Sequence, residues 1–299
     1  MKTKKSELTI IVPVYNEDQI LAFTAKEIIE YCVKKNWAVI FINDGSQDKS
    51  SSVLDELSTQ PDVTILNHKV NRGYGGAIKS GIRNTKTPYL VTIDADGQHN
   101  LEDIDMLFDL AIQQNADLVV GNRDNNSNAH TYRALGKQII RTFARMLMPL
   151  PIQDLNSGFK LYRTELAKKY IKICPDTMAF SDVITLAFIK QRNLVLEQNI
   201  NIKPRMAGKS TITIYTAIET IMEILNIAVL FNPLRIFLPI SFLCIAFGFI
   251  WGITILIIVG HGISVGAMLA IVTGIIFFVL GLLANQISAL RMEQLQDQI

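Results

Sequence analysis

The sequence predicts an α/β domain with a mostly parallel central sheet, followed by a hairpin of two transmembrane helices. Over residues 1–210, short runs rich in β-branched residues alternate with longer helix-compatible stretches. Continuous apolar strands of this kind are typical of a parallel sheet that helices cover on both faces. Residues 236–287, in contrast, contain no Asp, Glu, Lys or Arg. The average of 49% hydrophobic residues therefore combines two parts of different composition.

The expected strands and helices follow one another along the first part of the chain. Strands are expected at Leu8–Val12, Val39–Ile42, Val63–Leu66, Tyr89–Ile93, Leu118–Val120 and within Leu194–Ile202. Helices are expected at Ile20–Lys34, Ser50–Leu57, Gly76–Asn84 and Leu101–Gln114. Polar segments follow the first four strands, and open α/β sheets bind ligands beyond the carboxyl ends of their strands. The sequence therefore predicts one crevice lined by these polar ends.

The last third of the chain holds the membrane segments. The apolar runs at residues 236–260 and 263–287 each exceed the ~20 residues that a helix needs to cross a bilayer core. The connection around His261 permits only a tight hairpin. The alternative, two buried core helices, would leave no polar face for water. We expect a cytoplasmic domain over 1–210, juxtamembrane amphipathic helices over 211–234, and the hairpin with a short cytoplasmic tail over 235–299.

Charge and composition indicate where the chain resides. The apolar run near the N-terminus is interrupted by Pro13 and is too short for a signal peptide. Lys and Arg precede the hairpin and recur at Arg291, but none lies in its turn, so the positive-inside rule places the domain and both termini in the cytoplasm. The three cysteines lack metal-ligand spacing, which suits a reducing compartment. A net charge of +2 gives no support for nucleic-acid binding.

The segment VTIDADGQHN places Asp94 and Asp96 directly after an apolar run. If the extended backbone continues, both side chains point to one side. Two carboxylates that close would raise one pKa unless a cation lies between them, and hard oxygen ligands suit Mg²⁺ or Mn²⁺. The alternative is a simple turn, because Asp and Gly are favoured in turns. Neither a P-loop nor a dinucleotide-binding fingerprint is present.

Four segments, IVPVYNE, INDGSQDKS, NRGYGGAIKSG and VTIDADGQHN, occur in the order and spacing that resemble family-2 glycosyltransferases. That resemblance covers about residues 8–210 and implies a GT-A fold, a nucleotide-diphospho-sugar transferase domain that uses nucleotide-sugar donors. The later segments GNRD, DLNSGFK and RMAGKS resemble the dolichyl-phosphate mannose synthase-like branch, which includes bacterial polyprenyl-phosphate glycosyltransferases. Members of that branch glycosylate a polyprenyl phosphate.

The resemblance also implies roles for individual residues. The residues implied to bind the donor are Pro13, Tyr15, Glu17, Asp44, Gly73 and Ala95. Those implied to hold the metal are Asp94, Asp96 and Gln98. Those implied to act in catalysis are Asp94, Asp96 and Arg205. Those implied to bind the acceptor phosphate are Arg123, Arg133, Ser157 and Lys209.

For several neighbours of these residues, the sequence leaves two interpretations open. Gly73, Gly75 and Gly76 allow close approach of the donor or form a flexible helix start. Ser46 and Asp48 belong to the donor site or form a turn and N-cap. His99 receives no chemistry and is expected behind the site or on the surface. We interpret Asp154 as a positioning residue and a weak candidate base.

A basic stretch between the motifs predicts contact with the membrane. Arg133, Lys137, Arg141 and Arg145 recur every four residues among apolar ones, which is typical of a basic amphipathic helix on an anionic membrane surface. The alternative is a solvated charged face. Arg205 and Lys209 lie in a loop that either closes over the phosphates or contacts lipid headgroups.

Together these observations predict an inverting, metal-dependent transfer of a hexose from a UDP- or GDP-linked donor to a polyprenyl phosphate. One rival is a processive polysaccharide synthase, but the Gln-x-x-Arg-Trp motif of that branch is missing. The other is a non-catalytic membrane scaffold. Association between hairpins through Gly248, Gly252, Gly274 and Gly281 would give a homo-oligomer.

Overall fold

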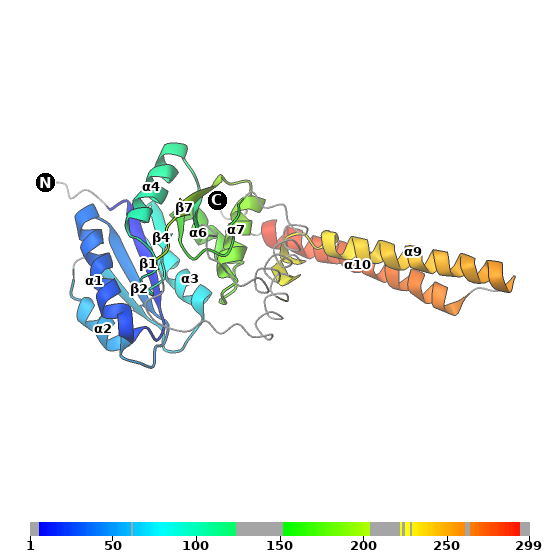
Figure 1. Cartoon of the computed structure of the whole chain (residues 1–299), viewed down its shortest axis with the longest axis horizontal. Helices are drawn as coiled ribbons and strands as arrows, with labels where there is room; N and C mark the ends of the chain where they lie inside the picture. Colours follow the sequence, from blue (N-terminus) through cyan, green and yellow to red (C-terminus); the bar gives the residue numbers. More distant parts are fainter. Residues whose placement is uncertain are drawn as a thin grey trace. The chain divides into compact units, whose positions relative to one another are not determined.

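The structure is a computed structural model, and it describes residues 6–60, 62–123, 152–203, 222, 225–227, 229–260 and 264–293. The chain forms two compact units (Figure 1). One unit contains the described residues up to 203, and the other contains those from 222 onward.

The first unit is built on a seven-stranded sheet with the strand order β3-β2-β1-β4-β6-β5-β7. The strands are β1 (Leu8–Val14), β2 (Ala38–Asn43), β3 (Val63–Asn67), β4 (Tyr89–Thr92), β5 (Leu118–Arg123), β6 (Lys160–Arg163) and β7 (Val195–Ile200). Among these seven described strands, only β6 runs antiparallel to its neighbours β4 and β5, while the other pairings are parallel. The prediction of a mostly parallel sheet is therefore confirmed.

Helices cover both faces of this sheet, with α1, α2 and α4 on one side and α3, α6 and α7 on the other (Figure 1). They are α1 (Asp18–Lys35), α2 (Ser50–Leu57), α3 (Tyr74–Asn84), α4 (Glu102–Gln114), α6 (Thr164–Tyr170) and α7 (Phe180–Lys190). The central strand β1 shows why both faces need cover. Its Ile10 and Ile11 are fully buried although neighbouring strand residues point to opposite faces.

On the α3 face the packing is very close. A Cβ atom added to Gly81 would lie 2.6 Å from Ile11 Cγ2, so only glycine lets α3 sit this near the sheet. The sequence did not predict β6, α6 or α7. Strand β6 has charged residues at both ends, Lys160 and Arg163, and for this reason it lacks the apolar pattern of a buried strand.

The second unit contains the predicted hairpin, formed by α9 (Leu234–Val259) and α10 (Val265–Glu293). Both helices are long and apolar enough to cross a bilayer, with a mean hydropathy of 2.7 each. Large apolar side chains such as Phe242, Ile257 and Ile258 are at least 70% exposed. Such exposure suits contact with lipid, because soluble proteins rarely expose apolar area of this extent.

Small residues hold the two helices of the hairpin together. Cβ atoms added to Gly248 and Gly274 would lie 2.7 Å from Ile271 Cγ1 and 2.5 Å from Ile245 Cγ1 of the opposite helix. Ser241 Oγ also donates a hydrogen bond of 2.7 Å to the Gly274 carbonyl. Gly252 and Gly281 likewise face side chains of the opposite helix. These glycines therefore pack within one hairpin and do not offer the free surface on which the homo-oligomer prediction depended.

We predict that Gly274→Leu destabilises the hairpin, because a larger side chain must push α9 and α10 apart. Overpacking of this kind costs about 1–3 kcal/mol. Thermal unfolding of the purified full-length protein in detergent would measure the loss. Gly266→Leu is the control, since a Cβ atom there meets only Ser264 Oγ, at 3.7 Å, among the described residues. Equal unfolding temperatures for the two variants would contradict the packing.

Candidate active site

The carboxyl ends of β1, β2 and β4 surround a cleft of about 440 Å³. The residues that line it are Pro13, Val14, Tyr15, Glu17, Asp44, Asn71, Gly73, Tyr74, Ala77, Asp94, Ala95, Asp96 and Met178. The structure thus brings all six predicted donor residues together with both predicted metal carboxylates. Asn71, Tyr74 and Met178 are additional lining residues that the sequence reasoning missed.

The backbone at Asp94 and Asp96 differs from the predicted extension. Strand β4 ends at Thr92, and the chain turns at Ala95 and Asp96 before Gly97, whose φ is +70°. The turn interpretation is therefore right for the backbone, and the argument from strand alternation was wrong. Asp96 Oδ1 accepts a bond of 3.1 Å from the Gln98 backbone N–H inside this turn. Both carboxylates nevertheless line the cleft.

Gln98, the third predicted metal ligand, is not among the residues that line the cleft. Its backbone carbonyl accepts a hydrogen bond of 2.9 Å from Lys203 N, and its Nε2 donates to the Lys203 carbonyl at 3.4 Å. His99 and Ile202 form a bridge beside this contact. Ile202 and Lys203, the last described residues before Arg205 and Lys209 in the sequence, therefore pair with the segment that follows the Asp94–Asp96 turn.

Asp94 lies beside Tyr74 of the NRGYGG segment and Gly158 of the DLNSGFK segment. A Cβ atom added to Gly158 would lie 2.9 Å from the Tyr74 hydroxyl and 3.1 Å from Asp94 Oδ2. Thr92 Oγ1 also donates a hydrogen bond of 2.6 Å to the Gly158 carbonyl. Burial raises the pKa of Tyr74 well above its ordinary value, and Asp94 adds to this shift. Tyr74 therefore stays a neutral hydroxyl that can donate toward the Asp94 carboxylate.

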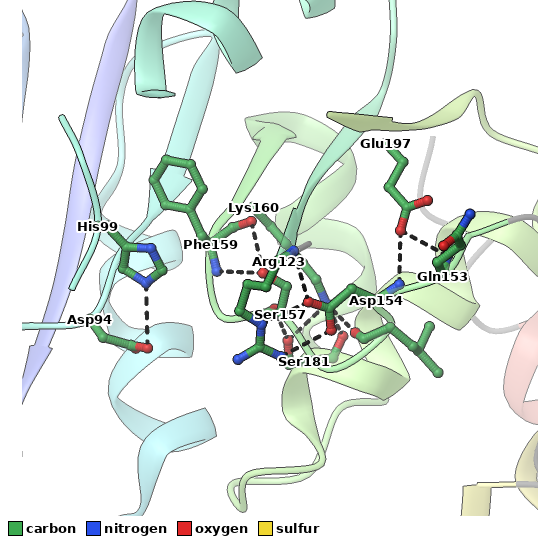
Figure 2. Close-up of polar contacts among 11 residues, drawn as sticks. Asp94, His99, Arg123, Gln153, Asp154, Ser157, Phe159, Lys160, Ser181 and Glu197 are labelled. Atoms are coloured by element: carbon green, nitrogen blue, oxygen red, sulfur yellow. Dashed lines mark hydrogen bonds and ion pairs between the residues drawn. The ribbon is translucent and has the colours of Figure 1, made fainter. Parts of the chain in front are cut away.

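Arg123, at the end of β5, forms a bidentate ion pair with Asp154 (Figure 2). Its Nε lies 2.7 Å from Oδ2 and its Nη2 lies 2.9 Å from Oδ1. Glu197 Oε1 accepts bonds of 2.8 Å from the backbone N–H groups of Gln153 and Asp154 and so holds the backbone from which the Asp154 side chain projects. A guanidinium has five N–H donors, and the bonds to described residues use Nε and one N–H of Nη2, which leaves further donors for an anionic ligand.

The ion pair also sets the charges of its partners. The hydrogen bonds that Arg123 donates to Asp154 raise the pKa of Arg123. Burial would raise the pKa of Asp154, but the bonds from Arg123 outweigh burial and lower it. A carboxylate with a lowered pKa is a poor proton acceptor, so this geometry favours Asp154 as a positioning residue for Arg123.

Near this ion pair, Lys160 is completely buried and holds the loop that contains Ser157 in place through hydrogen bonds. Its Nζ donates to the Leu155 carbonyl, the Ser181 carbonyl and Ser181 Oγ at 2.7 Å each, and to Thr185 Oγ1 at 2.8 Å. Ser181 Oγ in turn donates to the Ser157 carbonyl. Burial lowers the pKa of Lys160 from 10.5 to about 7, although these four acceptors favour the ammonium.

Ser157 itself is fully buried, and its hydroxyl bonds to the backbone of Phe159. It would have to leave this partner to reach a phosphate, so direct contact with the acceptor stays a prediction. Arg133, Arg205 and Lys209, together with the basic stretch up to Arg145 and most of 211–230, lie outside the residues that the structure describes.

His99 lies behind Asp94 and not on the surface. Its side chain is 8% exposed, its ring stacks on Phe159 at 4.8 Å, and its Nε2 lies 3.8 Å from Asp94 Oδ2 (Figure 2). Within the described part of the chain, its buried Nδ1 has no hydrogen-bond partner. The surface interpretation of His99 was therefore wrong.

Two further alternatives are decided by packing. Cβ atoms added to Gly75 and Gly76 would lie 2.5 Å from the Pro175 carbonyl and 2.7 Å from Arg72 Cβ, so both glycines are needed to make room for neighbouring parts of the chain. Their approach to a donor stays a prediction. Asp48 accepts bonds from the N–H groups of Asp18 and Ser50, at the starts of α1 and α2. Asp48 therefore binds the first turns of both helices, although the N-cap residue of α2 is Lys49 and not Asp48.

The cleft residues fit a divalent cation that a diphosphate shares. Among the described residues, no cluster of three or more His, Cys, Asp or Glu side chains could hold a metal alone. Mg²⁺ is often bound by only one or two carboxylates together with substrate phosphates and water. Asp94 and Asp96 meet this requirement.

Comparison with known proteins places the chain. Residues 9–171 match the family model described as Glycosyl transferase family 2. The chain belongs to this family. Residues 232–290 match a second model, the GtrB C-terminal hairpin, which coincides with α9 and α10. The protein is thus a family-2 glycosyltransferase with an apolar C-terminal hairpin.

Curated relatives of this glycosyltransferase include enzymes named for lipid phosphates. It is 24% identical to an undecaprenyl-phosphate 4-deoxy-4-formamido-L-arabinose transferase of Photorhabdus laumondii, over 94% of this chain and 88% of that protein. It is 29% identical to the dolichyl-phosphate beta-glucosyltransferase ALG5A of Trichomonas vaginalis, over 54% of each chain.

A solved structure shares the fold of this glycosyltransferase. It is glucosyl-3-phosphoglycerate synthase of Mycobacterium tuberculosis, in complex with Mn²⁺, UDP and phosphoglyceric acid. The TM-score is 0.57 at 15% identity, covering 75% of this chain and 78% of that one. The GT-A expectation for the fold is confirmed.

We predict that Lys160→Met changes how stability depends on pH. The pKa of Lys160 is about 7 in the folded protein and 10.5 in the unfolded chain, so between these pH values the unfolded chain binds more protons. The free energy of unfolding of the wild type should therefore rise between pH 7 and 9. The gain relative to Lys160→Met should approach roughly 2 kcal/mol. Unfolding of both full-length proteins at several pH values measures it, and parallel curves would exclude the lowered pKa.

Proposed function

We propose that this glycosyltransferase moves a hexose from a UDP- or GDP-linked donor to a polyprenyl phosphate, with inversion at the anomeric carbon. The observation that carries the proposal is the meeting of the donor cleft with the Asp154–Gly158 loop at Asp94. The names of the curated relatives support a lipid-phosphate acceptor.

The donor side uses residues of the cleft. Pro13, Tyr15, Glu17, Asp44 and Gly73 would border the nucleotide, with Ala95 near the diphosphate. Asp94 and Asp96, with Gln98 as a third ligand, would hold Mg²⁺ or Mn²⁺. When bound, the metal would offset the negative charge that develops on the leaving nucleoside diphosphate. The complex of the Mycobacterium tuberculosis synthase with Mn²⁺ and UDP supports this choice of cofactor.

The acceptor side uses cations held in place. Arg123, fixed by Asp154, would bind the lipid phosphate together with Arg133, Ser157 and Lys209, and Arg205 would assist the departure of the diphosphate. A phosphate oxygen forms the new bond to the anomeric carbon while the bond to the diphosphate breaks. A lipid phosphate is already anionic near neutral pH, so this step needs no strong general base.

The location follows from the hairpin and the distribution of charge. The chain would act at the inner face of the cytoplasmic membrane, with two passes and both termini in the cytoplasm. Residues 1–210 would form the catalytic domain, 211–234 the juxtamembrane helices, and 235–299 the hairpin and tail.

We predict that membranes containing the protein make a polyprenyl-phosphate sugar when given the right nucleotide sugar and Mg²⁺ or Mn²⁺. A panel of UDP- and GDP-sugars with undecaprenyl phosphate, followed by extraction and mass spectrometry, identifies the product and its anomeric configuration. Formation of a long polymer would favour a polysaccharide synthase. No lipid-linked product with any donor would contradict the proposal and favour the scaffold.

We also predict that Asp96→Ala reduces transfer by roughly 10²-fold or more, because the diphosphate loses the metal that offsets its charge. The rate of product formation over a titration of Mg²⁺ and Mn²⁺ measures the loss. Asp109→Ala, on the exposed face of α4, is the matched control and should keep the wild-type rate. Near-normal transfer by Asp96→Ala would remove this residue from the metal site.

A further inference from the structure

A chain of hydrogen bonds leads away from the donor cleft through a histidine that the function above does not use. His68 Nδ1 lies 2.6 Å from Asp44 Oδ1, and His68 Nε2 lies 2.9 Å from Ser80 Oγ. Ser80 Oγ also contacts the Gly76 carbonyl at 3.2 Å. Three elements are thereby connected, since Asp44 follows β2, His68 follows β3 and Ser80 lies on α3.

The burial and chemistry of His68 and Asp44 determine which of the two donates the hydrogen bond between them. The side chains of His68 and Asp44 are only 7% and 4% exposed. An ionised carboxylate can only accept hydrogen bonds, so His68 Nδ1 must carry the proton that it shares with Asp44. A short bond between a buried carboxylate and a ring N–H is charge-assisted and stronger than a bond between neutral groups.

The same carboxylate oxygen accepts a second bond, from the backbone N–H of Arg72 at 2.9 Å. Two donors therefore fix Oδ1, while Asp44 lines the cleft. In the part of the chain that the structure describes, Oδ2 has no hydrogen bond to another residue. Asp44 can therefore present Oδ2 to a donor group of a ligand in the cleft.

His68 does not touch the cleft. It lines a neighbouring polar groove of about 570 Å³ with residues such as Asn67 and Lys69. A group that contacts Asp44 from behind can affect a ligand only through Asp44. This arrangement distinguishes His68 from the residues that line the cleft itself.

We propose that His68, braced by Ser80, is a positioning residue that holds Asp44 for the nucleotide of the sugar donor. The inference rests on the proposed function, because it takes the cleft to be the donor site. It adds that affinity for the nucleoside diphosphate depends on two residues that never touch the nucleotide. Chemistry at the anomeric carbon and binding of the lipid phosphate do not depend on them.

The test compares variants of the full-length protein in detergent, using UDP and GDP as binding probes with Mg²⁺. His68→Leu should raise the Kd of the preferred nucleoside diphosphate and the KM for the sugar donor by roughly tenfold, the effect of losing one charge-assisted hydrogen bond. The values of kcat and of KM for polyprenyl phosphate should stay within about twofold, which general structural damage would not produce.

Matched variants separate the contributions. His68→Asn should recover most of the affinity, because its side-chain amide can place an N–H near the position of Nδ1. Ser80→Ala should raise the donor KM in the same direction but less. Lys69→Ala is the control, since Lys69 is exposed and lies beside His68 in the groove but not in the cleft.

Contrary results are distinguishable. If Asp44→Asn loses nucleotide binding while His68→Leu keeps it, the positioning role is overturned and the donor site stands. If Asp44→Asn binds nucleotide normally, both the positioning role and the assignment of Asp44 to the donor site fail. Should His68→Leu not fold, an unchanged donor KM in Ser80→Ala would overturn the proposal.

Discussion

The antiparallel pairing of β6 with β4 is the contact on which the active site depends. Thr92 at the end of β4 pairs with Lys160 at the start of β6. Because β6 runs opposite to β4, the loop that precedes β6 lies beside the turn that follows β4. A parallel strand in this place would carry that loop to the opposite edge of the sheet. The bond from Thr92 Oγ1 to the Gly158 carbonyl fixes the same junction.

This junction concentrates charge, and the surrounding structure compensates for it. Arg123 and Asp154 neutralise one another through a bidentate pair, and Lys160 directs its buried ammonium at four oxygen atoms. Buried charges without such partners would cost several kcal/mol each. These partners offset the cost of burial and hold the loop from Asp154 to Gly158 beside Asp94. Such positioning suits the transfer proposed above, because holding reacting groups in the right geometry speeds their reaction.

The hairpin is held together by close packing of small residues. Between α9 and α10 there is little charge to pair, and helix association in lipid relies on close contact between small residues. Gly248 and Gly274 provide that contact inside one chain, and Ser241 adds a hydrogen bond. The outward side chains are left to the lipid. The catalytic unit and the hairpin are therefore stabilised by separate interactions.

The sequence by itself determined the class of fold, the hairpin and a crevice at the strand ends, because apolar runs and strand ends are local patterns. The resemblance of its motifs to family-2 glycosyltransferases indicated which residues surround that crevice. It missed β6, whose charged ends conceal a buried strand, and it placed Asp94 and Asp96 on an extension that is in fact a turn. Only the tertiary structure decided that Lys160 is buried, that Gly75 and Gly76 accommodate the chain, and that His68 reaches Asp44. These contacts join residues far apart in the sequence, and a local pattern contains no information about which distant partner fills the space beside a side chain.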